Sequence, residues 1–309
     1  MKQALITLQP ASPYNFDLTA TYATYFRGRY GSDTFEDGIF RRLLDLGNNL
    51  CLASVRSSGT INSPSLEVEL TGAVLNYATV DKARVQVGRI LGISQDLTPF
   101  YRQVEDDPVL TPLIKALRGL HIPQTVSVYE ALVLAILGQQ VSSHVARIMR
   151  NLLIETYGPA LEVSGVLYHS FPRPGDLANV GVDGLRNLKF STRKAQYIAD
   201  ISNDMVSGRL DLEGLRTHTD EEVIRILTNI RGVGLWTAHW LFIRALGRTD
   251  GFPFDDLALC RTLGQLLNAD APLKPKEALD YSLRWSPFRS YVTAYLFAAM
   301  RSGYISHSN

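Results

Sequence analysis

The residues best suited to chemistry lie between positions 227 and 257. There a Gly-Val-Gly turn, Gly232 to Gly234, joins two predicted helices. Glycines permit positive φ and close backbone approach, so successive N–H groups can face an anion at the start of the next helix. We expect Val233 to tuck between the helices. A lone Gly-x-Gly is more typical of a plain connector, so the neighbouring residues decide between the two interpretations.

Trp236 and Trp240 follow the turn and lie four residues apart, so they share one helix face. Two such indoles can simply pack in a core. Beside a phosphate-binding turn they can instead line a pocket in which an extruded base stacks, a contact worth ~1–3 kcal/mol per base. A positively charged, alkylated base would gain a further cation–π attraction.

Two adjacent carboxylates, Asp255 and Asp256, precede an apolar helix that begins at Leu257. One aspartate is expected to cap this helix, and we assign the cap to Asp255. The apolar surroundings leave the second carboxylate for chemistry. It could oppose the positive charge that develops on a sugar C1′ as a glycosidic bond breaks, or activate water.

Gln140 lies in a polar loop between two apolar helices. Such a loop can be a simple kink between core helices. It can also push a side chain into a duplex to fill the gap that an extruded nucleotide leaves. The amide of Gln140 would then hydrogen-bond the unpaired partner base.

The first 95 residues predict an α+β unit with a small antiparallel sheet. Strand patterns cover 4–8, 50–55 and 65–70, and helical patterns cover 34–46 and 80–91. After residue 95 the strand patterns fade. We therefore divide the chain into an N-terminal α+β domain, 1–95, and an all-α domain, 96–309.

Helical patterns position the chemical residues in this second domain. The capping box of Thr219 and Glu222 predicts a helix start just before the turn. The expected helices cover 128–137, 142–157, 192–207, 220–228, 236–246, 257–267 and 290–301.

Composition narrows the class of protein. The formal net charge is +1, so a nucleic-acid surface would have to be a local patch. No apolar stretch approaches the ~20 residues that span a bilayer, and the N-terminus lacks a secretory pattern. Two isolated cysteines, Cys51 and Cys260, fit a reducing cytoplasm and exclude a four-cysteine iron–sulfur cluster. We expect a cytoplasmic monomer without membrane association.

Together these residues resemble the helix-hairpin-helix DNA glycosylase superfamily, and within it the bacterial DNA-3-methyladenine glycosylase II type. The resemblance rests on Pro13-Tyr14 near the start, AILGQQVS at 135–142, RGVGLWTA at 231–238, the Asp255-Asp256 pair and WSPFRSY at 285–291. It implies a small N-terminal antiparallel sheet domain followed by a mainly α-helical glycosylase domain. It also implies Asp256 as the catalytic aspartate. The base pocket would be formed by Trp236, Trp240, Phe297 and Tyr22.

The resemblance further implies double-stranded DNA with damaged bases as the partner. The DNA-binding positions would be Gln140, Arg231, Gly232, Gly234 and Thr237. No cofactor is required, although the hairpins of this family usually hold a monovalent cation. Here Na⁺ or K⁺ would be bound by the backbone carbonyls of Thr228, Ile230 and Val233.

Two positions depart from the family pattern. Arg231 replaces the proline that usually precedes the turn. Trp236 stands where bifunctional members carry a Schiff-base lysine, so strand cleavage by β-elimination is not expected. The resemblance thus implies a monofunctional glycosylase that releases 3-methyladenine and 7-methylguanine and leaves an abasic site. A glycosylase for deaminated or oxidised bases and a non-catalytic sensor of damaged DNA remain alternatives.

Overall fold

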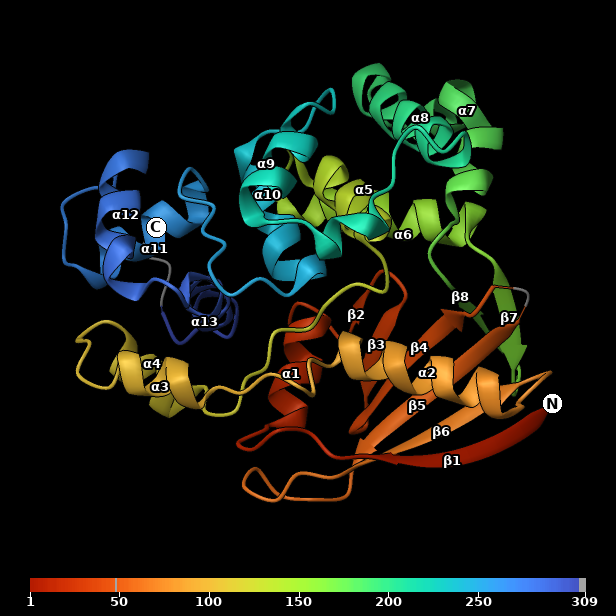
Figure 1. Ribbon diagram of the computed structural model, residues 1–309, viewed down its shortest axis with the longest axis horizontal. Helices are drawn as coiled ribbons and strands as arrows, with labels where there is room; N and C mark the ends of the chain where they lie inside the picture. The colour runs from red at the N-terminus through yellow and green to blue at the C-terminus, as the bar shows by residue number, and fades with distance from the viewer. Residues whose placement is uncertain (48, 306–309) are drawn as a thin grey trace.

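The computed structural model describes residues 1–47 and 49–305. A twisted β-sheet forms the N-terminal part, and helices cover most of the remainder (Figure 1). The predicted α+β class is therefore confirmed. No helix in the described ranges is long and apolar enough to cross a bilayer.

The sheet has six antiparallel strands in the order β1-β6-β5-β4-β3-β2. Helix α2 (Tyr77–Ile90) lies across one face, and α1 (Phe16–Ala23) lies at the end nearest the C-terminal helices (Figure 1). The predicted strands correspond to β1, β5 and β6. The strands are β1 (Lys2–Leu8), β2 (Arg29–Tyr30), β3 (Asp33–Glu36), β4 (Ile39–Asp45), β5 (Leu50–Ser57) and β6 (Leu66–Gly72).

The prediction of a helix over 34–46 is wrong, because this segment forms the β3–β4 hairpin. Asp37 and Gly38 occupy the two-residue turn with φ of 53° and 69°. Positive φ at both positions matches the twist of a tight hairpin and suits Asp-Gly. The hairpin pairs Glu36 with Ile39. The spacing of the apolar residues in 34–46 is compatible with a helix, whereas the Asp-Gly dipeptide is typical of a hairpin turn.

The helices predicted after residue 95 are confirmed to within about two residues at their ends. They are α5 (Val128–Gly138), α6 (Ser143–Tyr157), α8 (Thr192–Val206), α9 (Asp220–Thr228), α10 (Leu235–Leu241), α11 (Leu257–Leu266) and α13 (Arg289–Arg301). A turn of π-helix, Phe242–Leu246, continues α10. Four further helices were not predicted from the sequence, namely α3 (Thr98–Gln103), α4 (Leu110–Ala116), α7 (Pro174–Asn187) and α12 (Pro275–Ser282).

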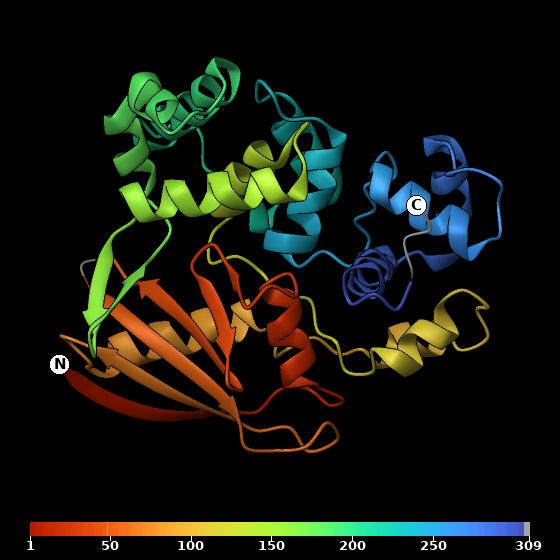
Figure 2. The ribbon, with the colours of Figure 1, turned by 180° about the vertical axis from the view of Figure 1, so that it is seen from behind.

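The expectation of a purely helical second part is corrected by a small hairpin. β7 (Ala160–Val163) and β8 (Val166–His169) pair through a turn at Ser164 and Gly165, both with positive φ. The hairpin extends from the helices to lie beside β5 and β4 (Figure 2). Its strands are only four residues long and none of their residues is buried, so the run is too short to reveal a strand from the sequence.

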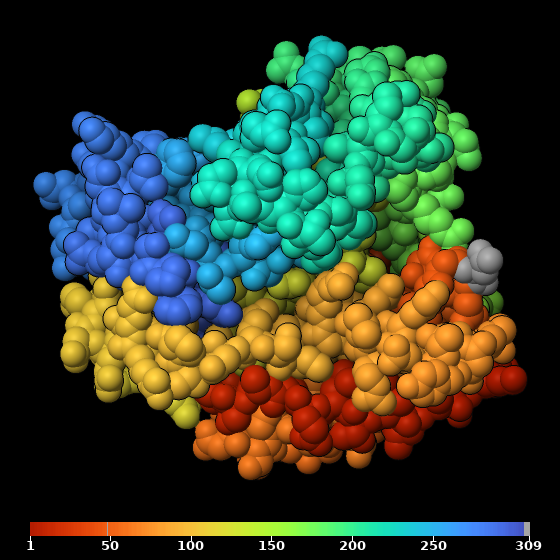
Figure 3. All heavy atoms as spheres, in the orientation of Figure 1, coloured from red at the N-terminus to blue at the C-terminus, as the bar shows by residue number. Residues whose placement is uncertain are grey.

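The helical part contains two hydrophobic cores. One is built from residues between Val128 and Ala245. The other joins the segment 97–122 to the C-terminal helices and includes Tyr22 of α1. Figure 3 shows this segment, in yellow, directly against the C-terminal helices, in blue. Trp236 packs on the first core and Trp240 on the second, so α10 spans the seam between them.

A buried ion-pair network ties the sheet to the helical part. Arg42 of β4 is 4% exposed. Its Nη2 lies 2.8 Å from both carboxylate oxygens of Glu130 in α5, and its Nη1 lies 3.0 Å from Asp33. Removing the cation would leave two carboxylates buried without their partner.

We therefore expect Arg42→Met to lower the free energy of unfolding by about 3–5 kcal/mol, measured by urea denaturation. Arg29→Met is the matched control. It breaks the exposed Arg29–Glu155 pair at 2.6 Å, which is expected to cost only about 0–1 kcal/mol. Equal losses in the two variants would show that the buried network does not hold the two parts together.

Candidate active site

The hairpin that begins the site is built by two helices and a tight turn. Thr219 and Glu222 form the predicted capping box of α9. Val233 lies buried at the turn, as expected. Gly232 has a φ of 89°, and a Cβ there would lie 2.3 Å from the Tyr197 ring. Both the backbone conformation and the close ring therefore require glycine at this position.

Gly234 serves a different purpose, because its φ of −111° suits any residue. It is the N-cap of α10, and a Cβ there would meet nothing within 4 Å. The fold therefore does not require glycine. The open space above the α10 N-terminus instead allows an external group to approach the backbone closely.

A glutamine connects this turn to the neighbouring loop. The Gln139 side-chain amide donates to the Gly232 carbonyl at 3.0 Å and to Thr237 Oγ1 at 3.3 Å. Thr237 is only 1% exposed, so its hydroxyl lies inside the protein, where it accepts the hydrogen bond from Gln139. The structure thus does not place the Thr237 side chain on the predicted DNA-binding surface. Gln140 itself is exposed on the loop, with a φ of 53°.

Asp256 is the best-anchored polar group of the site. Its Oδ1 accepts hydrogen bonds from the backbone N–H groups of Ala258 and Leu259, at 2.9 and 3.1 Å. Its Oδ2 accepts one from Trp236 Nε1 at 2.9 Å. Asp256, not Asp255, is therefore the N-cap of α11, which corrects the assignment made from the sequence. Asp255 is exposed one residue earlier.

The negative charges of Asp255 and Asp256 affect the thiol of Cys260. Burial raises the pKa of Cys260, and the carboxylates of Asp256 and Asp255 raise it further. The same field would favour a positive charge on an atom placed next to Asp256. A carboxylate with two fixed oxygens can offer this stabilisation without rearranging.

Aromatic rings lead away from Asp256 in a continuous row. The ring centroids of Trp236 and Trp240 are 5.9 Å apart, and those of Trp240 and Phe297 are 5.3 Å apart. Trp236 and Trp240 are partly exposed, while Phe297 and Tyr22 are 4% and 1% exposed. The structure therefore brings Trp236, Trp240 and Phe297 together. Tyr22 lies near them through Arg301, whose guanidinium carbon is 5.6 Å from the Tyr22 ring centroid and 5.0 Å from that of Phe297.

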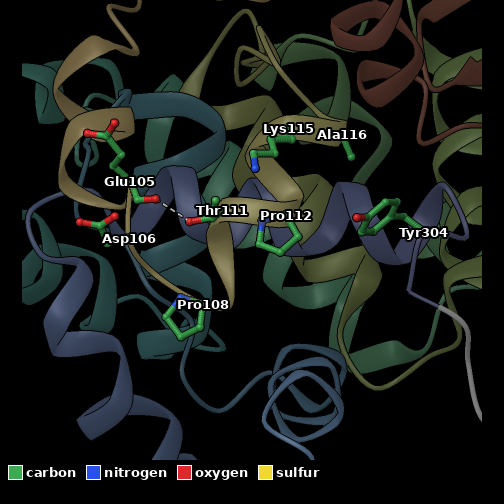
Figure 4. Close-up of a pocket in the computed structure, with 8 residues that line it drawn as sticks. All are labelled: Glu105, Asp106, Pro108, Thr111, Pro112, Lys115, Ala116 and Tyr304. Carbon is green, nitrogen blue, oxygen red and sulfur yellow. Dashed lines mark hydrogen bonds between the residues drawn. The ribbon is translucent and has the colours of Figure 1, made fainter.

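Arg231 lies exposed on the hairpin, with its guanidinium 5.7 Å from the centroid of the Tyr197 ring. Behind it lies a hollow of about 870 Å³ that includes Tyr197, Ile230 and Arg231. A second hollow of about 750 Å³, shown in Figure 4, is lined by residues of 105–116 and by Tyr304. It contains none of the predicted site residues.

The donor set at the hairpin fits a monovalent cation. In the described part of the chain, the carbonyls of Thr228 and Val233 accept no backbone N–H, and that of Ile230 accepts the Val233 N–H at 3.0 Å. A carbonyl oxygen has two lone pairs, so all three retain capacity for a metal. Neutral oxygen ligands suit Na⁺ or K⁺.

A family model described as "HhH-GPD superfamily base excision DNA repair protein" matches residues 133–287, which is half of the chain. The chain belongs to this superfamily. The matched range contains the hairpin, the two tryptophans and Asp256, so the resemblance inferred from these motifs is confirmed.

Individual relatives agree with this assignment. A DNA-3-methyladenine glycosylase of Bacillus subtilis is 31% identical over 208 residues, covering 67% of this chain and 69% of that protein. The 3-methyladenine DNA-glycosylase structure from Archaeoglobus fulgidus superposes with a TM-score of 0.85 at 25% identity, covering 98% and 99% of the two chains. The 8-oxoguanine glycosylase/lyase of Clostridium acetobutylicum, at 16% identity and a TM-score of 0.76 over 98% of this chain and 99% of that one, shares the fold.

One aromatic residue next to the site was not predicted from the sequence. Tyr25 lies just after α1 with a φ of 54°, uncommon for a bulky residue. Its ring stacks on Tyr30 at 3.8 Å and lies 4.0 Å from the Arg301 guanidinium. No local pattern predicts this backbone conformation, so the sequence offered no signal for it.

Proposed function

We propose that this protein is a monofunctional DNA glycosylase that releases N-alkylated purines, such as 3-methyladenine and 7-methylguanine, from duplex DNA. The observation that carries the proposal is the fixed Asp256 carboxylate at the end of a row of aromatic rings. The names of the relatives support the substrate class.

In this proposal the hairpin binds the DNA backbone. The open N-terminus of α10 at Gly234 accepts a phosphate, and Arg231 adds charge beside it. Gln139 holds the neighbouring loop against the hairpin, so Gln140 is positioned to enter the duplex where the damaged nucleotide has left it. Na⁺ or K⁺ on the hairpin carbonyls of Thr228, Ile230 and Val233 would stiffen the turn.

The chemistry follows from the charge of the base. An N-alkylated purine is a cation in DNA, so its glycosidic bond is already weakened. The electron pair of that bond moves to the departing base, and positive charge develops at C1′. Asp256 stabilises this charge and directs water to C1′, while Trp236 and Trp240 hold the base by stacking.

Strand cleavage is not expected, because Trp236 occupies the position of the Schiff-base lysine of bifunctional family members. Protein incubated with methylated duplex DNA should release bases but leave strands intact until hot alkali is added. Sodium borohydride should trap no covalent complex with DNA. Strand breaks without alkali, together with a trapped complex, would refute the monofunctional assignment. We further propose that the enzyme acts as a cytoplasmic monomer, with the division at residues 95 and 96 as its domain boundary.

A further inference from the structure

The loop that carries Gln140 follows the C-terminal end of α5, where the last carbonyls of a helix have no partner within it. The last turn of α5 contains no basic residue. Two other helices supply cations instead. Lys194 Nζ of α8 donates to the Leu137 carbonyl at 2.7 Å. Arg150 of α6 donates to the Leu134 carbonyl through Nε at 3.2 Å and through Nη2 at 2.7 Å. The negative end of the helix dipole also attracts both charges, so α6 and α8 fix the end of α5.

The two cations lie close together at this helix end. A Cβ at Gly138 would lie 2.8 Å from Arg150 Nη2, so glycine is the residue that lets the guanidinium approach. Burial lowers the pKa of Lys194, and the charge of Arg150 lowers it further. Two like charges repel each other at this separation. The carbonyls of α5 offset that repulsion because they accept hydrogen bonds from both side chains.

The same loop is fixed on its other side by the hairpin. The Gln139 amide donates to the Gly232 carbonyl at 3.0 Å. Gln140 comes next, exposed and with a φ of 53°. A residue with a Cβ resists this left-handed conformation, which persists only where the surrounding structure holds the backbone. The bond from Lys194 to Leu137, three residues before Gln140, is one of the contacts that hold it.

The conformation of Gln140 matters at the moment when a nucleotide leaves the duplex. In the proposed function this side chain enters the gap and hydrogen-bonds the unpaired partner base. A side chain that is already oriented loses little conformational freedom when it enters. Without the ammonium of Lys194, the Leu137 carbonyl would lose its partner and the loop would adopt other conformations. Entry of Gln140 would then cost more free energy and would be slower.

We propose that Lys194 is a positioning residue for Gln140, and that its bond to the end of α5 keeps the loop ready to enter the duplex. This inference rests on the proposed function. Lys194 acts through the loop rather than on the damaged base, so its effect should depend on whether a partner base is present. That dependence separates a positioning role from a general contribution to stability.

The test uses two duplexes that each contain one 7-methylguanine. In the first it lies opposite cytosine, and in the second it lies opposite a tetrahydrofuran abasic analogue, which offers Gln140 no base to bond. Base release is measured in single turnover with protein in excess. Lys194→Met should release base from the first duplex about tenfold more slowly than wild type, and from the second within about twofold of it. Gln140→Ala should show the same pattern, and the double variant should be no slower than Gln140→Ala alone.

Two further variants control for charge and for the hydrogen bond. Lys194→Arg keeps a cationic donor and should recover most of the rate on the cytosine duplex. Lys82→Met removes the same charge from an exposed position on α2 and should match wild type on both duplexes. Because each protein sample is compared on two substrates, a loss of folded protein cannot produce the expected ratio.

The outcomes separate this inference from the proposed function. Equal slowing by Lys194→Met on the two duplexes would overturn the inference, and so would an unchanged rate on the cytosine duplex. Losses from Lys194→Met and Gln140→Ala that simply multiply in the double variant would also overturn it. In each of these cases release by the wild-type protein leaves the proposed function intact. No release by the wild-type protein from either duplex would contradict the proposed function itself, and the inference with it.

Discussion

Asp256→Asn is expected to slow base release by about 10²–10⁴-fold while DNA binding and folding persist. Asparagine keeps a side-chain oxygen that can accept the backbone N–H groups of Ala258 and Leu259, and it is as good an N-cap as aspartate. What disappears is the negative charge, which stabilises C1′ and activates water. The measurement is single-turnover release of 3-methyladenine from methylated duplex DNA, alongside affinity for undamaged duplex.

The adjacent carboxylate provides the control. Asp255 is exposed, whereas Asp256 is half-buried and accepts a hydrogen bond from Trp236 Nε1. Asp255→Asn should therefore retain release within a fewfold of wild type. If Asp256→Asn were nearly fully active, or if Asp255→Asn were the inactive variant, the catalytic assignment would be wrong.

Gly234→Asp is expected to weaken binding to all duplex sequences alike, by about two orders of magnitude. Aspartate fits the backbone there and is a favourable N-cap, so the fold should tolerate it. Its carboxylate would occupy the space where a phosphate approaches and would repel it. Equilibrium binding to several undamaged duplexes, at two salt concentrations, measures the loss and its dependence on ionic strength.

Gly175→Asp makes the same change of charge at another helix start. Gly175 lies in the first turn of α7, and a Cβ there also meets nothing within 4 Å. This variant should bind DNA nearly as well as wild type. Similar losses in both variants would indicate a general effect of net charge and would count against the hairpin as the phosphate site.

The hairpin and its carboxylate could be predicted because their signals are local. The Thr219–Glu222 capping box, the Gly-Val-Gly turn and the tryptophans four residues apart all lie within about forty residues of Asp256. Each follows from helix geometry and backbone sterics. The superfamily assignment confirmed the fold that these motifs imply.

The predictions were wrong or incomplete where two local patterns compete, or where contacts between residues distant in the sequence determine the structure. At 34–46 an apolar spacing typical of a helix outweighed the Asp-Gly turn, although the structure forms a hairpin. Either aspartate could cap α11 by sequence, and the structure assigns the cap to Asp256, whose Oδ1 accepts the backbone N–H groups of Ala258 and Leu259. The guanidinium groups of Arg244 and Arg301 lie near the Tyr25 ring, and no single-sequence pattern relates these three positions.

The most direct test of the central claim is to incubate the wild-type protein and Asp256→Asn with methylated duplex DNA and to identify the released molecules by mass. We predict free 3-methyladenine from the wild-type protein, with an equal number of abasic sites in the DNA, and almost none from the variant. Tight binding without any released base, or equal release by both proteins, would contradict a glycosylase that works through Asp256.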